Sequence, residues 1–448
     1  MTDVTSPADE RRSWRETVLV YFTPVMLSML ILGFASGLPL YMVFQKLSFW
    51  LRDAGIERST IGFFYWVTLS YTFKFLWAPI VDRIKIPVLH SLLGPRRSWI
   101  VTAIGGTVIG LAIISQTDPT QNLIPVAIGA LLLSYSGATL DVAIDAWRIE
   151  SAPNRMQANM AAAYSFGYRI AYMMSGLGLA ISEWTNWTVS FLAMAAAMAI
   201  SAVLVFFMKE PLAGLAKREL EGSFLQKVAL SVWEPFKQFL SRLGMWLFPV
   251  IALVMIYRMS DFTMGVMASP LYADIGFDRA IVGGIQSGPG LAATMFGLFV
   301  GGVAVFRFGL MKALVIGLVI TLITNGAYAW LAATADSDSI WQLTVAIVGD
   351  NLAGGFVTTA FIAYLSSLVD PANAATQYAL ISSFYAFVAK FLSGFSGVLA
   401  DAVGYVNFFL ITASWTLPAA IVLFVIMIYG PKAATGKHKF AERETVAS

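Results

Sequence analysis

Residues 61–99 read IGFFYWVTLSYTFKFLWAPIVDRIKIPVLHSLLGPRRSW, and this stretch decides the fold class of the chain. It begins with an aromatic, apolar run that is long enough to cross a lipid bilayer, with Lys74 inside it. The run stops at Asp82-Arg83, and a short loop ending in Arg96-Arg97 leads to the next apolar run. Two apolar helices joined by a short basic loop predict two membrane passes connected on the cytosolic side.

The composition of the whole chain agrees with a membrane protein. Hydrophobic residues make up 58% of the 448 residues, charged residues make up 12%, and the mean hydropathy is +0.74. Such a chain has too few polar groups to cover the surface of a soluble domain. The absence of cysteine excludes disulfides, thiol catalysis and cysteine metal sites. With only His90 and His438, we expect neither a metal site nor a cofactor.

Twelve apolar segments are candidates for membrane spans, so the predicted fold class is an all-α membrane protein. The polar residues before the first span contain no convincing cleavage site, which indicates a cytosolic tail instead of a signal peptide. The candidate spans are residues 20–45, 59–80, 98–117, 122–147, 158–182, 188–208, 243–269, 279–304, 311–334, 339–368, 374–401 and 406–429.

The distribution of basic residues predicts the orientation. Of the 29 lysines and arginines, 21 fall in the tails and the even-numbered loops. Only Lys46, Arg52, Arg58 and Arg279 fall in odd-numbered loops, and the remaining four lie inside spans. Cytoplasmic loops carry the excess of basic residues in membrane proteins. Both termini are therefore predicted to be cytosolic.

Two pairs of similar segments indicate that the chain is a duplication of a six-helix unit. The segment Leu51-x-Asp53-x-Gly55-x-Glu57-Arg58-x-x-x-Gly62 returns 221 residues later as Tyr272-x-Asp274-x-Gly276-x-Asp278-Arg279-x-x-x-Gly283. The pattern Ser165-Phe166, Ser175-Gly176 and Glu183 returns 218 residues later as Ser383-Phe384, Ser393-Gly394 and Asp401. Parallel repeats of this kind are the architecture of the major facilitator superfamily, in which the site lies between the halves near the middle of the membrane.

The duplication divides the chain into five predicted parts. In the long linker, apolar residues from Phe224 to Phe239 recur on one side of a helix, with basic residues around the rest, which is typical of a helix lying on the inner leaflet. The predicted parts are the tail 1–19, the first bundle 20–208, the cytosolic linker 209–242, the second bundle 243–430 and the tail 431–448.

Several strings identify a narrower resemblance, to the AmpG-type muropeptide permeases. The strings are Leu32-Gly33-Phe34-Ala35-Ser36-Gly37-Leu38-Pro39-Leu40, Lys74-Phe75-Leu76-Trp77-Ala78-Pro79, Asp141-Val142-Ala143-Ile144-Asp145-Ala146-Trp147, Gly167-Tyr168-Arg169, Asn351-Leu352-Ala353-Gly354-Gly355 and Ala375-Thr376-Gln377-Tyr378-Ala379-Leu380. The resemblance extends from span one to span eleven. It implies a proton-coupled importer of anhydromuropeptides, the disaccharide-peptide products of wall turnover, in the bacterial inner membrane.

The chain departs from that family at three places, which leaves the cargo open. Gly94-Pro95-Arg96-Arg97 replaces a run of three arginines, Leu140 replaces a polar residue, and Gln286-Ser287 replaces a pair with a positive charge. Another large anionic or amphipathic cargo, such as a siderophore, an acyl-coenzyme A or a drug, is the alternative within transporters. A signalling scaffold without transport, or a membrane enzyme, is the alternative from another class.

Carboxylates inside apolar spans are the candidates for proton coupling. Such charges are costly in lipid and need a partner or a cavity. Asp141, Asp145 and Arg148 share one face of span four, with Asp141 lying deeper, and Arg258 and Asp261 are spaced to pair in span seven. Asp141, Asp261 and Asp145 are the candidates. The alternative for each is a structural ion pair.

Cations, amides and aromatic rings inside spans are the candidates for cargo binding. A guanidinium can hold a peptide carboxylate through two hydrogen bonds, and sugars bind aromatic faces and amides. Each residue has packing or charge neutralisation as its alternative role. The candidates are Arg169, Arg258, Lys390, Tyr41, Gln45, Tyr164, Tyr168, Gln286, Asn351 and Gln377.

The charges of the first cytosolic loop have a mechanical interpretation besides the topological one. They could latch neighbouring helices at the face where a transporter opens and closes, and the candidate gating residues are Lys74, Asp82, Arg83, Arg96 and Arg97. No nucleophile–base pair, phosphate loop or metal spacing appears in the sequence, so we expect no enzyme. The basic residues are spread over the membrane flanks, so we expect no nucleic-acid partner. We expect a monomer.

Overall fold

The computed structural model describes residues 22–151, 156–211, 241–368 and 374–435, and the regular structure in these ranges is helical. The predicted tail 1–19 and the predicted amphipathic helix of the linker lie outside these ranges. The predicted boundaries of the five parts stay predictions.

The first pass is longer than predicted. It consists of α2 (Pro24–Tyr41), the π-helical turn η2 (Met42–Leu47) and α3 (Ser48–Asp53). Pro39 lies near the end of α2, where its missing N–H and its ring disturb the α-helical hydrogen bonding before the π turn begins. The predicted end at residue 45 is therefore wrong. Lys46 and Arg52, which the sequence placed in a loop, lie within this helix, and Lys46 is fully buried.

The other passes of the first half follow in order. The second pass is interrupted by short 3₁₀ segments. Its segments are α4 (Arg58–Phe64), η3 (Tyr65–Thr68), α5 (Leu69–Phe73), η4 (Lys74–Leu76) and α6 (Ala78–Arg83). After the short α7 (Leu89–Leu93), the remaining helices are α8 (Pro95–Ser115), α9 (Leu123–Ser151), α10 (Gln157–Trp184) and α11 (Trp187–Phe206).

The second half begins with a broken pass, in which η6 (Gly244–Trp246) and α13 (Leu247–Ile256) precede α14 (Met259–Ile275). The break places Arg258 at the start of α14 with non-helical φ and ψ. The following elements are α15 (Arg279–Ile285), η7 (Gln286–Gly290), α16 (Leu291–Phe308), α17 (Leu310–Thr334), α18 (Ile340–Leu368), α19 (Ala374–Ser393), α20 (Ser396–Ser414), α21 (Thr416–Tyr429) and α22 (Lys432–Thr435).

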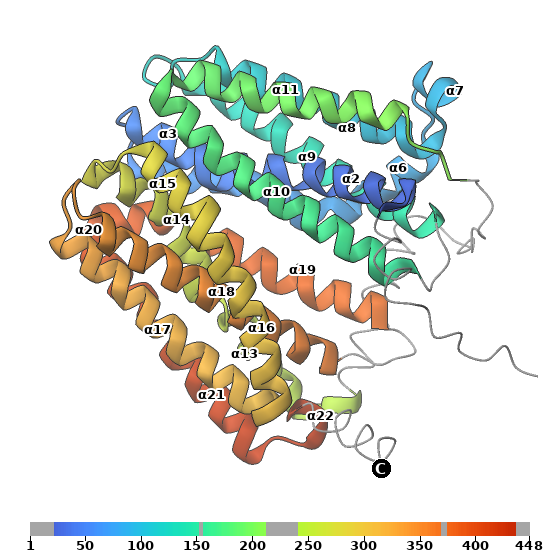
Figure 1. The fold of residues 1–448 in the computed structure, drawn as a ribbon. Coiled ribbons are helices and arrows are strands. Elements are labelled where there is room, and N and C mark those ends of the chain that lie inside the picture. Colours follow the sequence, from blue (N-terminus) through green and yellow to red (C-terminus); the bar gives the residue numbers. More distant parts are fainter. Residues whose placement is uncertain (1–21, 152–155, 212–240, 369–373, 436–448) are drawn as a thin grey trace, which may run out of the picture.

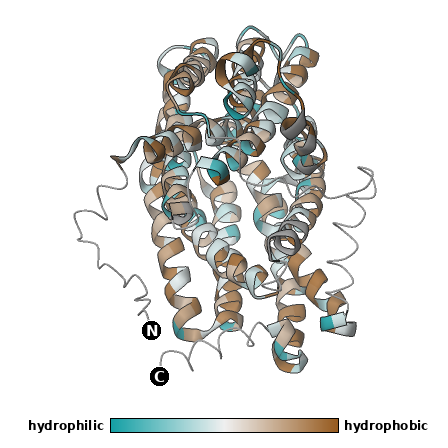
Figure 2. Ribbon diagram, turned by 90° about the vertical axis from the view of Figure 1, so that its right-hand side faces the viewer, coloured by the Kyte–Doolittle hydropathy of each residue, from teal (hydrophilic) through white to brown (hydrophobic). Residues whose placement is uncertain are grey.

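The described helices provide the twelve predicted passes. Nine helical segments in the described ranges are long and apolar enough to cross a membrane. The broken helix α4–α6, the more polar α10 and the shorter α19 supply three more, which makes twelve. Gly404, with φ 76° and ψ 164°, kinks α20 between the eleventh and twelfth predicted spans. Hydrophobic residues dominate the helices (Figure 2), and large apolar side chains such as Phe299 and Ile323 are exposed along them.

The helices form two groups that meet at one end (Figure 1). Helices α2–α11 make up one half and helices α13–α22 the other. The halves come together where α3, α15 and α20 lie, whereas α11 and α21 diverge toward the opposite end. We call the first of these the latch end and the second the tail end. The protein has the two-half, twelve-helix fold that the sequence predicted.

Glycines allow the two halves to approach closely at the latch end. A Cβ atom on Gly283 of α15 would collide with the backbone oxygen of Gly176 on α10. A Cβ atom on Gly397 of α20 would likewise collide with the backbone oxygen of Arg58 on α4. Small residues are common where membrane helices approach this closely. These contacts close the bundle at its latch end.

Candidate functional site

A cavity of about 350 Å³ lies between the two halves. Its lining comes from both halves and combines aromatic rings, amides and charges, which is the mixture that fixes a polar ligand in a largely apolar site. From the first half the polar and aromatic lining includes Tyr41, Phe44, Gln45, Tyr65 and Tyr172. From the second half it includes Arg258, Asp261, Phe262, Ser269, Tyr272, Gln286, Tyr328, Asp350 and Asn351.

Six of the residues predicted from the sequence meet in this cavity. They are Tyr41, Gln45, Arg258, Asp261, Gln286 and Asn351. The predicted pair in span seven is confirmed, because Arg258 Nε lies 3.3 Å from Asp261 Oδ2. Their roles in binding or coupling stay predictions.

Tyrosines from α2 and α10 form an aromatic wall on the side of the first half. The ring of Tyr41 lies edge-on to Tyr168 at 5.5 Å and to Tyr172 at 5.0 Å. Tyr164 lies one turn further, with its ring 6.0 Å from that of Tyr168. Arg169 on α10 is partly exposed and close enough to Tyr41 to act on it electrostatically. Among the described residues, no carboxylate pairs with Arg169.

A second polar cluster surrounds Asp141 of α9. Its carboxylate accepts hydrogen bonds from Ser36 Oγ and from Lys74 Nζ, the latter at 3.1 Å. Ser36 Oγ is in turn 2.6 Å from the hydroxyl of Tyr164. Lys74, which the sequence suggested as a gating residue, is therefore the cation that neutralises Asp141. The sequence looked to Arg148 for this role, but Arg148 lies 3.4 Å from Asp145.

Lys390 of α19 reaches across the boundary between the halves. Its ammonium group donates to the backbone oxygen of Thr68 at 3.1 Å and lies 5.7 Å from the ring centre of Tyr71. It does not line the central cavity. Gln377 lies on the same helix, but its side chain is outside the described residues.

The basic loop at the tail end connects elements of the first half. Arg96 Nη2 lies 2.6 Å from Glu150 of α9, and Arg97 Nη1 donates to the backbone oxygen of Met208 at 2.5 Å. Glu210 accepts the backbone N–H groups of Arg96 and Arg97, which caps the start of α8. The side chains of Asp82 and Arg83 lie outside the described residues. Gating by this loop stays a prediction.

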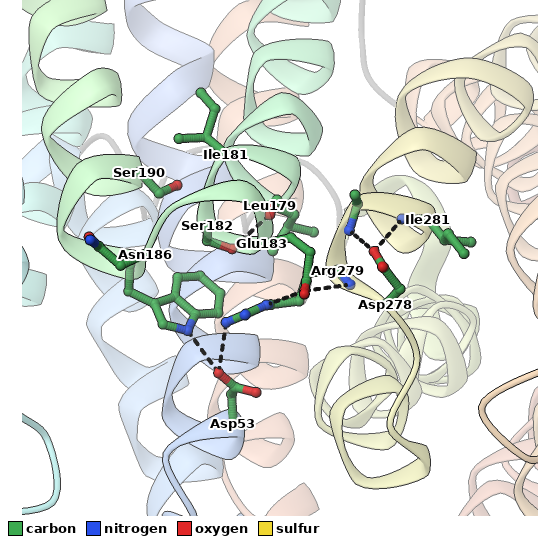
Figure 3. A network of polar contacts seen from close by, with 12 residues as sticks. Asp53, Leu179, Ile181, Ser182, Glu183, Asn186, Ser190, Asp278, Arg279 and Ile281 are labelled. Carbon is green, nitrogen blue, oxygen red and sulfur yellow. Dashed lines mark hydrogen bonds and ion pairs between the residues drawn. The ribbon is translucent and has the colours of Figure 1, made fainter.

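The latch end carries a network that joins the halves (Figure 3). Arg279 at the start of α15 lies 2.7 Å from Glu183 of α10 and 3.0 Å from Asp53 of α3. Its guanidinium carbon lies 5.2 Å from the ring centre of Trp187, whose indole N–H donates to Asp53 at 2.8 Å. Three elements of the first half therefore hold one arginine of the second half.

The same arrangement recurs with the halves exchanged. Arg58 at the start of α4 lies 3.3 Å from Asp401 and 3.8 Å from Asp274. It stacks at 4.5 Å over Tyr405, whose hydroxyl donates to Asp274 at 2.8 Å. These four residues follow Arg279, Asp53, Glu183 and Trp187 at the repeat offsets seen in the sequence, so the network is built twice. We call the eight residues the double latch.

Two charged residues of the interior were missed or misplaced by sequence reasoning. Asp350 was placed toward the outer side, but it lines the central cavity. It lies ten residues into α18, which at about 1.5 Å per residue is roughly half of a bilayer core of about 30 Å. Counting depth along the span would have located it. Lys46 is buried against Ser190 and the ring of Phe191, 5.0 Å from its centre.

The loop carboxylates differ from those in the interior. Hydrogen bonds from Thr120 hold the pKa of Asp118 below its usual value, and the hydroxyl of Ser339 does the same for Asp336. Both groups therefore stay ionised near neutral pH. In the described ranges, no group of three or more histidine, aspartate or glutamate side chains is placed to hold a metal ion.

Comparisons with known proteins extend over nearly the whole chain. The sequence model of the Major Facilitator Superfamily matches residues 25–392 and again residues 250–447. The anhydromuropeptide permease of Escherichia coli K12 is 31% identical, over 91% of this chain and 80% of that protein. A Rickettsia conorii protein named AmpG 4 is 32% identical, over 90% of this chain and 95% of that protein.

Solved structures agree at the level of the fold. The nucleoside transporter NupG superposes with a TM-score of 0.68 at 14% sequence identity, over 90% of this chain and 99% of that chain. At such low identity the likeness concerns the arrangement of helices alone.

Proposed function

Because this chain belongs to the Major Facilitator Superfamily and, within it, to the family of the anhydromuropeptide permeases, we propose that it imports anhydromuropeptides across the bacterial inner membrane together with protons. The chain is a transporter and not an enzyme. The observation that carries the proposed cargo is the 31% identity to a permease named for it, over 91% of this chain.

The chemistry of the cavity supports a cargo that is part sugar and part peptide. The tyrosine wall of Tyr41, Tyr168 and Tyr172 offers ring faces and edges of the kind that pack against sugars. Gln45, Gln286 and Asn351 offer amides for hydroxyl and acetamido groups. Gln286 Oε1 is a buried oxygen without a hydrogen-bond partner, so it is free to accept one from a cargo.

Alternating access follows from the way the halves meet. The double latch and the glycine contacts close one end of the bundle, and the cavity lies between the halves. Transport then requires the latch to open while the tail end closes around the cargo. One chain forms the whole cavity, which supports a monomeric transporter with the lipid bilayer as its surroundings.

Transport of the named cargo can be tested without any gradient. Vesicles loaded with unlabelled anhydromuropeptide should take up labelled anhydromuropeptide by counterflow, whereas empty vesicles and vesicles without protein should not. Counterflow of a siderophore, an acyl-coenzyme A or a drug in its place would assign the protein to the alternative cargo. No counterflow of any of these would contradict the proposal.

Arg169 is the expected anchor for a carboxylate of the peptide. It lies beside the tyrosine wall without an acidic partner among the described residues, so its charge is available to a cargo. A hydrogen bond to a charged group contributes about 1.5–3 kcal/mol. Arg169→Ala should therefore raise the KM for anhydromuropeptide about ten-fold or more.

The same cargo with its peptide carboxylates amidated provides the control for this prediction. Its KM should change by less than about two-fold on Arg169→Ala, because the contact is already missing. Arg169→Lys should recover part of the affinity, since it keeps the charge but loses the paired hydrogen bonds. An equal loss for both cargoes would show that Arg169 does not bind the carboxylate.

The basic residues support an orientation with both termini and the linker in the cytosol, so that the latch end faces outward. The chain lacks cysteine, which allows labelling of single introduced cysteines. Ser337→Cys, in the exposed loop between α17 and α18, should react with an impermeant maleimide from outside intact cells, and Leu220→Cys in the linker should react only after permeabilisation. Reaction of position 220 from outside would reverse the orientation.

A further inference from the structure

Most carboxylates in the interior of the bundle are neutralised by a cation. Asp141 lies 3.1 Å from Lys74, Asp261 lies 3.3 Å from Arg258, and Asp145 lies 3.4 Å from Arg148. A carboxylate with such a partner can remain charged in a membrane protein, because the pair as a whole has little net charge. None of these three needs a further cation in this conformation.

Asp350 differs from them because it has no partner. Among the described residues, no donor lies within hydrogen-bond distance of its carboxylate and no cation pairs with it. It is partly exposed to the central cavity, next to Asn351, which is itself bonded to Thr294 at 2.9 Å and to the backbone oxygen of Ile347 at 2.8 Å. The side chain is therefore open to whatever enters the cavity.

The groups that face Asp350 from neighbouring helices do not supply a counter-charge. The charged groups that act on it are Asp261 and Arg258 of α14, which already pair with each other. The titratable tyrosines near it are Tyr172 of α10, Tyr272 of α14 and Tyr328 of α17. The last two bond to one another, with 2.6 Å between their hydroxyls. A net negative charge would be left in the cavity if Asp350 were ionised.

An unpaired charge near the middle of a membrane is costly, and a proton removes it without changing the shape of the site. We propose that Asp350 is the carboxylate that carries the coupling proton. The proton binds the carboxylate oxygen from the outer side when the latch is open, and it leaves to the cytosol when the tail end is open. This inference rests on the proposed function, since it names the residue through which import is coupled to protons.

The location of Asp350 accounts for coupling to cargo. It shares the cavity with Gln286, Asn351 and the tyrosine wall, so that a cargo and the proton reach their sites through the same opening in each conformation. A loaded cavity with a protonated Asp350 carries no unpaired charge through the transition between conformations. A carboxylate in a loop could not impose this requirement, because water solvates it in every conformation.

Asp350→Asn tests the proposal, because asparagine keeps the shape and mimics the protonated form. With labelled anhydromuropeptide as the probe, the variant should keep counterflow within about two-fold of the unchanged protein. Accumulation driven by one unit of pH gradient should fall from about ten-fold to none for one proton per cargo, and cargo-dependent acidification of the vesicle lumen should disappear. Asp350→Glu should restore part of both, and Asp338→Asn, in an exposed loop of the same half, should change neither.

The alternatives give different results. Full accumulation by Asp350→Asn would overturn the proposal and return attention to Asp141 and Asp261. Loss of counterflow by Asp350→Asn would also overturn it, and if cargo with acetylated amino groups is still exchanged, Asp350 binds an ammonium group of the cargo instead. Failure of the unchanged protein to exchange the cargo at all would count against the proposed function and not against this assignment alone.

Discussion

A Gly283→Leu variant is expected to lose most of its transport activity, whereas Gly284→Leu should keep it. Gly283 lies against the backbone of Gly176, and an added Cβ would also come within 3.2 Å of Leu179. Overpacking of this kind costs about 1–3 kcal/mol. Because the contact joins the two halves, that cost falls on the conformation in which the latch end is closed. The population of this conformation should fall about five- to 150-fold, and the initial rate of counterflow should fall with it.

Gly284 is a closely matched control for this substitution. It is the next residue of α15 and has no atom within 4 Å of an added Cβ. Both substitutions put the same side chain into the same short helix, so helix propensity and expression are affected alike. Equal loss of transport by the two variants would mean that the close approach of the halves at Gly283 is unimportant for the transport cycle.

Removing both arginines of the double latch should open the outer end. Arg58→Ala combined with Arg279→Ala removes four ion pairs between the halves, with Asp53, Glu183, Asp274 and Asp401. Partly exposed pairs contribute about 0.2–1 kcal/mol each, so the sum is about 1–3 kcal/mol. This corresponds to a shift of about five- to 150-fold toward the conformation that is open at the latch end.

A cysteine in the cavity reports this shift. Gly265→Cys places a thiol in the cavity lining at a position with no atom within 4 Å of the added Cβ. Its reaction with an impermeant maleimide from the latch side should become at least about five-fold faster in the double variant. Arg307→Ala, at the other end of α16, should leave the rate unchanged. Unchanged labelling in the double variant would show that the latch does not control access.

The fold could be predicted from the sequence because lipid imposes a simple rule. Apolar segments of bilayer length and a bias of basic residues indicate the passes, and the repeated motifs indicate the two halves. The pair of Arg258 and Asp261 was also predictable, since residues three apart lie on one face of a helix. Each of these inferences depends on contacts that are local in the chain.

Contacts between helices were harder to predict. The partner of Asp141 is Lys74 on a different helix, because neighbouring helices bring cations to a carboxylate as readily as the same helix does. The repeat revealed equivalent residues around Arg58 and Arg279, but it did not indicate that each arginine binds carboxylates of the opposite half. Periodicity says which face a residue occupies and leaves open which helix that face meets.

The central claim is that this protein uses a proton gradient to concentrate anhydromuropeptide. It is tested most directly by uptake of the labelled cargo into proteoliposomes at equal pH and with the outside one unit more acidic. The cargo should equilibrate in the first case and accumulate about ten-fold in the second for one proton per cargo, and a protonophore should abolish the accumulation. Equal uptake with and without the pH gradient would contradict the account.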